Sequence, residues 1–168
     1  LLEQGYPAEK VETWPALYVI VLHQYRQFRA IRDLMFKWTY VPYAQTGERL
    51  KEGERTISGL SEYSQASVLA NPFVNALPAV RRVAFLDARL ARDIAMLRCV
   101  EAIRMYAAGH EGKLPSSLDA ITTVPVPLDP LDGQAFHYER AGDKAILESP
   151  VPPDGGPRDG LRYEITLR

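Results

Sequence analysis

One uninterrupted amphipathic segment constrains the fold of this chain more than any other feature. Residues 79–108 contain neither proline nor glycine, and Gly109 follows directly as a natural helix stop. Apolar residues recur in the segment at close to the helical period, at Val83, Leu86, Leu90, Ile94, Leu97, Val100, Ile103 and Ala107. Arginines fill much of the remaining surface, at Arg81, Arg82, Arg89, Arg92, Arg98 and Arg104. The sequence therefore predicts one long helix with an apolar face to bury.

A second long helix is predicted over residues 15–40. Pro15 suits a first helical turn, and Val41 with Pro42 ends the pattern. Its predicted buried stripe is Leu17, Val21, Gln24, Phe28, Ile31, Met35 and Trp38. The two stripes can cover one another, so we expect the two helices to pack together. The residues expected in this contact are Phe28, Ile31, Met35, Leu90, Ile94 and Leu97.

The regions before and after the long helix of residues 79–108 differ in their predicted secondary structure. Glycine and proline punctuate residues 42–78, which predicts an irregular middle with a short helix near residues 61–69. After Gly109, turn residues surround three short alternating segments at 134–140, 144–149 and 161–167, which predict strands. The expected fold is α+β: two long packed helices, an irregular middle and a small C-terminal antiparallel sheet. We expect residues 1–78 to form a helical and irregular N-terminal region, and residues 79–168 to form the long helix plus the small β-sheet, packed as one domain.

Composition and charge exclude several classes of protein. The 168 residues are 46% hydrophobic and 24% charged, which is typical of a soluble globular domain. A net charge of −1 argues against a nucleic-acid partner, because phosphate binding needs a concentrated basic surface. No apolar run reaches the roughly 20 residues of a membrane helix. The chain starts at Leu1, so we expect a fragment of a longer protein in which a membrane anchor can precede it.

The C-terminal half carries a set of turn signatures. A Gly-x-x-Pro-x-Ser-Leu stretch follows the long helix, and an Asp-Pro-x-x-Gly turn precedes a tyrosine-bearing hairpin; the residues are Gly112, Pro115, Ser117, Leu118, Asp129, Pro130, Gly133 and Tyr138. Together with the helix, this pattern resembles the globular domain of type II secretion pseudopilins. It is also similar to the pseudopilin-like tail of large uncharacterised bacterial proteins, notably from planctomycetes. The resemblance covers about residues 83–168, and residues 1–78 stand where a pseudopilin has its N-terminal apolar helix. It implies a domain shape and an extracytoplasmic location in a bacterium.

The resemblance also implies a calcium site, because major pseudopilins bind calcium in a C-terminal loop. The candidate ligands are the acidic turn residues Asp129, Asp132, Asp154 and Asp159. Carboxylates and loop carbonyls are the oxygen ligands that calcium takes. The alternative is that these side chains cap their own turns, as aspartate does beside proline and glycine. No other cofactor is expected.

Four aromatic residues gather near the end of the first helix and in the middle region: Trp38, Tyr40, Tyr43 and Tyr63. Tryptophan and tyrosine are enriched in protein interfaces, so this group is a candidate interaction surface. The alternative is that these rings divide between core and scattered surface positions.

Catalytic motifs are missing from the sequence. His110 and Glu111 begin like a zinc-peptidase helix, but position 114 is Leu where that motif needs a second histidine. Cys99 is the single cysteine, lies within the long helix and is expected in the core. We therefore expect a non-enzymatic structural or interaction module of a larger bacterial envelope protein. The competing hypothesis is a hydrolase or ligand-binding protein with a carboxylate site between helices and sheet, using Glu62, Asp129 or Asp132.

Overall fold

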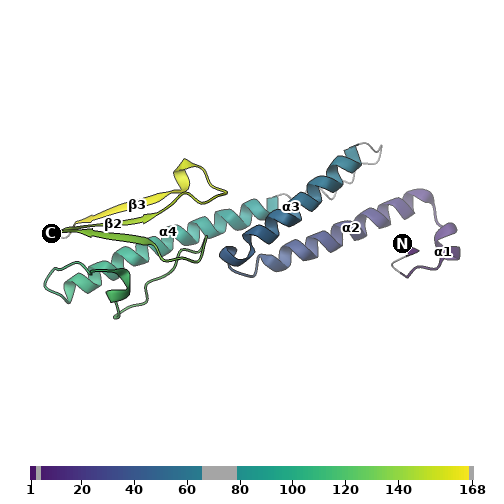
Figure 1. Cartoon of the computed structure of the whole chain (residues 1–168). Helices are drawn as coiled ribbons and strands as arrows, with labels where there is room; N and C mark the ends of the chain where they lie inside the picture. Colours follow the sequence, from purple (N-terminus) through teal and green to yellow (C-terminus); the bar gives the residue numbers. More distant parts are fainter. Residues whose placement is uncertain (3–4, 66–78, 167–168) are drawn as a thin grey trace. The chain divides into compact units, whose positions relative to one another are not determined.

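The computed structural model describes residues 1–2, 5–65 and 79–166 of the chain, apart from the side chains of residues 58 and 60–65 (Figure 1). Contacts divide the chain into two compact units. Unit 1 comprises Leu1–Val41 and Thr46–Val83, and unit 2 comprises Pro42–Gln45 and Ala84–Arg168. The described residues form three long helices and a three-stranded antiparallel sheet at the C-terminus. The predicted α+β class is therefore confirmed.

Unit 1 is helical. It holds α1 (Ala8–Glu12), which the sequence did not predict, and α2 (Ala16–Trp38), which matches the predicted first helix to within two residues at its C-terminal end. Met35 of α2 is buried together with Ile57, and Phe28, Ile31 and Val80 pack against this pair. The prediction that Met35 is a core residue is confirmed.

The prediction of an irregular middle is wrong over its first part, where α3 (Tyr43–Gln65) forms a helix of 23 residues. Glycine inside a helix costs only about 1 kcal/mol relative to alanine, so tertiary packing can override it. Gly53 shows what the residue supplies here, because a Cβ atom at this position would lie 3.2 Å from Cγ of Met35. Ser61, predicted to begin a short helix, is inside α3, and residues 66–69 of that predicted helix lie outside the described residues.

Unit 2 contains most of α4 (Ala79–Ala108), whose bounds are those predicted from the sequence. The sheet has the order β1 (His137–Ala141), β2 (Lys144–Ser149) and β3 (Leu161–Thr166), and Figure 1 shows it lying alongside α4. Ala141 pairs with Lys144, so the first hairpin turns through two residues, and Gly142 takes the positive φ of 64° that such a turn requires. Two 3-10 turns, Leu118–Ala120 and Pro157–Asp159, shape the connecting loops.

The core of unit 2 lies between α4, the sheet and the loop that follows the helix. Alternate residues of β2 face it, so Ala145, Leu147 and Ser149 are buried while their neighbours are more exposed. The helix contributes mostly small or flexible residues to the buried face: Ala88, Arg92, Ala95, Met96, Cys99, Ala102, Ile103 and Ala107.

This face corrects the predicted stripe of α4. Leu90, Ile94 and Leu97 were expected in the core, but 59%, 45% and 51% of their surfaces are exposed. Only Ile103 and Ala107 of the predicted stripe are buried, while Arg92, expected in solvent, is 1% exposed. The reason is steric: residues with short side chains let the sheet and loops approach the helix closely, and the larger residues lie outside that contact. Apolar periodicity located the helix but selected the wrong face.

Candidate functional site

The most concentrated polar chemistry of unit 2 is a buried network around Arg92, in the middle of α4. The guanidinium donates from Nε to Oδ2 of Asp129 over 2.7 Å, and both side chains are 2% exposed. It also donates from Nη2 to Oγ of Ser149, which in turn donates to the same Asp129 oxygen over 2.6 Å. Arginine, aspartate and serine therefore form a closed triangle of charge-assisted hydrogen bonds.

Two backbone carbonyls complete the ligation of Arg92. Nη1 donates to the carbonyl of Asp159 over 2.8 Å, and Nη2 donates to the carbonyl of Pro150 over 2.7 Å. A buried guanidinium needs such partners, because an unsatisfied buried charge costs several kcal/mol. One helix residue thereby joins the loop at Asp129, the end of β2 and the turn before β3.

Asp129 also makes hydrogen bonds within its own turn. Its Oδ1 accepts a hydrogen bond from the amide of Leu131 over 2.9 Å. Its backbone carbonyl accepts from Gly133, and its backbone amide donates to Gln134, both over 2.8 Å. Gly133 has φ of 74°, a conformation that glycine adopts without strain. The Asp-Pro-x-x-Gly signature thus shapes a tight turn that presents a carboxylate to Arg92.

Asp159 closes the other loop. Its Oδ2 accepts from the amide of Gly156 over 2.7 Å, and its Oδ1 lies 2.9 Å from Nη1 of Arg89. A Cβ atom at Gly155 would stand 3.0 Å from Cβ of Asp159, so the chain passes tightly around this carboxylate. Asp159 and Asp129 therefore each bind one arginine of α4.

The arrangement suits a structural tie better than a reaction centre. The Ser149 hydroxyl donates to a carboxylate that already pairs with Arg92, and no described histidine takes part in the network. All three side chains are at most 3% exposed. The network can hold three chain segments in register with the helix.

The four candidate calcium ligands fall into two groups. Asp129 and Asp159 are buried against arginines, as described above, so a cation there would have to displace Arg92 or Arg89. Asp132 and Asp154 are exposed; Asp132 accepts from the amide of Gln134, and Asp154 lies 3.5 Å from the Tyr43 hydroxyl. Among the described residues, no cluster of three or more His, Cys, Asp or Glu side chains could hold a metal ion. The calcium site stays a prediction.

Three of the four aromatic candidates have side chains that the structure describes. In unit 1, Nζ of Lys37 and Cζ of Arg49 lie 4.6 and 4.9 Å from the centroid of the Trp38 ring. Tyr40 is 87% exposed. Tyr43 in unit 2 packs edge to face on Phe85, with ring centroids 5.8 Å apart. The side chain of Tyr63 lies outside the described residues, as does that of Glu62. The predicted interaction surface stays a prediction.

Cys99 is a buried thiol, as the sequence indicated. Its Sγ lies 3.7 Å from the carbonyl of Pro127, and burial raises the pKa of the Cys99 thiol to about 11. At neutral pH the group is protonated and therefore a poor nucleophile. His110 stacks on Tyr106 with ring centroids 3.8 Å apart, and its Nδ1 lies 2.7 Å from the Tyr106 carbonyl, so this imidazole caps the end of α4.

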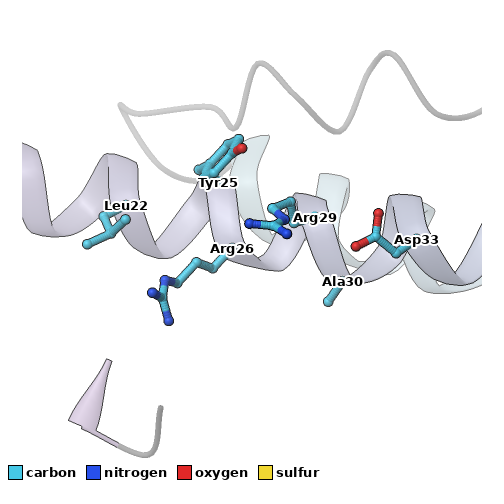
Figure 2. Close-up of a pocket in the computed structure, with 6 residues that line it drawn as sticks. All are labelled: Leu22, Tyr25, Arg26, Arg29, Ala30 and Asp33. Atoms are coloured by element: carbon cyan, nitrogen blue, oxygen red, sulfur yellow. The ribbon is translucent and has the colours of Figure 1, made fainter. Parts of the chain in front are cut away.

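Unit 1 offers an open hollow along α2, with a volume of about 450 Å³ (Figure 2). Its lining residues all come from that one helix: Leu22, Tyr25, Arg26, Arg29, Ala30 and Asp33. Arg26 already lies over the Tyr6 ring at 4.5 Å and donates to its hydroxyl, and Asp33 pairs with Arg32 over 2.6 Å. Two of the three charged residues that line the hollow, Arg26 and Asp33, are therefore engaged with neighbouring side chains.

Compared with known proteins, the chain matches no family model, no curated protein and no solved structure. A search of the described helices finds none that is both long and apolar enough to span a membrane. The pseudopilin resemblance stays a prediction.

The two arginines that organise unit 2 were not predicted from the sequence. Both Arg92 and Arg89 were assigned to the solvent face of α4. A usable signal was present, because Arg92 shares its helix face with Ala88, Ala95 and Cys99, at spacings of four, three and seven residues. An arginine within a row of small residues has room to run along the helix toward a partner carboxylate.

Proposed function

We propose that this chain is a non-enzymatic structural or interaction module of a larger bacterial envelope protein. The observation that carries the proposal is the Arg92 network. Ser149 and Asp129 are residue types that catalyse reactions elsewhere, yet here they bind one another and a buried arginine. These hydrogen bonds hold the loops against the helix, which is a structural role.

The turn signatures support the same proposal. Gly112 takes φ of 76° just after α4, and its amide donates to the carbonyl of Ala107 over 2.9 Å, which caps the helix. The hydroxyl of Tyr138 donates to the carbonyl of Pro115 over 2.8 Å and ties the hairpin to the loop after the helix. These roles explain the pseudopilin-like residues as construction of a small domain. The envelope location rests on that resemblance.

The proposal is tested by a broad panel of esterase, phosphatase, peptidase and glycosidase substrates. We expect no turnover above that of a mock preparation purified in parallel. The matched variants are Asp132→Asn and Glu62→Gln, which remove two of the three carboxylates of the competing hydrolase hypothesis. Turnover that one of these substitutions abolishes without changing the melting temperature would overturn the proposal.

The location is tested separately in the bacterium. A reporter enzyme that is active only outside the cytoplasm would be fused after Arg168 of this chain, in a gene that keeps the natural reading frame upstream of it. Reporter activity is the expected result. Folded, soluble fusion protein that is inactive and remains in the cytoplasm would contradict an envelope role.

A further inference from the structure

An apolar stripe runs along α4 on the side that unit 2 does not cover. Leu86, Leu90, Ile94 and Leu97 are 46%, 59%, 45% and 51% exposed. They are spaced by four, four and three residues, so they share one helix face, opposite the buried row of Ala88, Arg92, Ala95 and Cys99. Their exposed surface amounts to roughly 350 Å², which is the size of the largest apolar patch on many monomeric proteins.

The four apolar residues of the stripe have nearly the same spacing when followed in either direction along the helix. Leu86 and Leu97 lie symmetrically about the level of residues 91–92, and Leu90 and Ile94 lie symmetrically about residue 92. An interface between two identical copies related by a twofold axis requires such self-complementarity, because each residue meets the partner's counterpart from the other end.

The charges beside the stripe have the same symmetry with opposite signs. Asp87 and Arg98 are exposed, lie eleven residues apart and centre between residues 92 and 93, within one residue of the centre of the stripe. Eleven residues make three helical turns plus about 20°, so the two side chains lie on one flank of the stripe. Neither has an ion-pair partner among the described residues.

We propose that α4 binds α4 of a second copy of this chain, antiparallel, through Leu86, Leu90, Ile94 and Leu97. In this arrangement Asp87 of each copy faces the partner's Arg98, which gives two equivalent ion pairs. A parallel arrangement would place the two copies of this flank on opposite sides of the pair and each residue at its own level, so Asp87 would not meet the partner's Arg98. This inference rests on the proposed function, since it names the partner of an interaction module.

The area predicts a reversible dimer. Stable interfaces bury about 800 Å² per partner, and the apolar stripe of roughly 350 Å² is well below that area, as in weak and transient interfaces. We therefore expect a dissociation constant on the order of 1–100 µM. Analytical ultracentrifugation of the chain from low to high micromolar concentration measures it directly.

Leu90→Ser tests the apolar contact at the centre of the stripe. We expect the dissociation constant to rise about tenfold or more, because central apolar residues dominate interfaces. Leu128→Ser is the matched control, since Leu128 is 56% exposed and lies outside α4. It should leave the dimer unchanged. Circular dichroism and the melting temperature of the dilute protein confirm that both variants fold.

Charge reversal tests the orientation. Asp87→Arg alone and Arg98→Asp alone should each weaken the dimer about tenfold, because each replaces two attractions by two repulsions. The double variant restores both pairs with exchanged signs and should dimerise like the parent. A parallel dimer gains nothing from this exchange.

Each outcome decides the proposal. A folded parent that stays monomeric at high micromolar concentration overturns it, as does a dimer that Leu90→Ser leaves intact. A double charge variant no stronger than the single variants overturns the antiparallel arrangement. These results are independent of the substrate panel, so failure of the dimer and failure of the non-enzymatic role are distinguishable.

Discussion

The two long faces of α4 carry opposite kinds of residue. The face that unit 2 buries holds Ala88, Ala95 and Cys99 with one charged residue, Arg92, whereas large aliphatic residues such as Leu90 and Ile94 lie outside. Hydrophobic content alone would assign these faces the other way round. The buried face of the helix is the one that the sheet and its loops can approach most closely, and small residues permit the closest approach. The aliphatic face is then left exposed.

The buried face also shows how a core can accommodate a charge. Arg92 neutralises Asp129 and satisfies two carbonyls at loop ends that would otherwise need other donors. A buried ion pair adds little net stability over a well-packed apolar alternative, but removing one partner is costly. The comparison of the two faces therefore predicts large effects on the buried side and small effects on the exposed side.

Asp129→Ala should give the largest loss. It leaves the Arg92 charge without its counter-ion and removes the acceptor for the Leu131 amide, so the free energy of unfolding should fall by about 3–5 kcal/mol. Urea denaturation followed by circular dichroism measures the loss. Asp132→Ala is the control in the same turn; it removes an exposed acceptor and should cost about 1 kcal/mol or less. Equal losses in the two variants would refute the role of the network.

A double-mutant cycle sharpens the same point with a smaller expected effect. Arg92→Met and Asp129→Leu each strand a buried partner, but together they remove both charges. The double variant should be more stable than the sum of the single losses predicts, by about 1–3 kcal/mol. Strict additivity of the two losses would mean that Arg92 and Asp129 do not act as a pair.

Cys99 gives a prediction that involves no loss of stability. In the folded protein at pH 8, the thiol should resist a thiol-specific chromogenic reagent, because it is buried and its pKa is raised to about 11. In protein unfolded by urea, the same thiol is exposed and should react completely before the first reading of a manually mixed assay. As pH rises, its thiolate fraction in the folded protein increases only near pH 11. Rapid labelling of the native protein at pH 8 would place Cys99 outside the core.

Local patterns in the sequence predicted most of the elements. The bounds of α4 and β2 are those predicted, because an unbroken helical period and a strand between turn residues are local signals. The middle helix α3 was missed because Gly53 and Gly59 suggest turns, while the close approach of Met35 that favours glycine is a tertiary contact.

The site was less accessible to sequence reasoning than the fold. Asp129 and Asp159 were singled out as acidic turn residues, and both are structurally engaged, but their partners are arginines 37 and 70 residues away along the chain. Spacing rules cannot connect residues that meet only through the packing of a sheet on a helix. The same limit explains why the buried face of α4 was assigned to the aliphatic residues.

The most direct test of the two-face account is a pair of identical substitutions on one helix. Ile103 is fully buried, whereas Ile94 is 45% exposed, and both are replaced by alanine. Measured by urea denaturation at concentrations too low for copies to associate, Ile103→Ala should lose about 2–5 kcal/mol and Ile94→Ala less than about 1 kcal/mol. An Ile94→Ala loss equal to or larger than that of Ile103→Ala would contradict the account, because it would place the aliphatic face in the core of the folded chain.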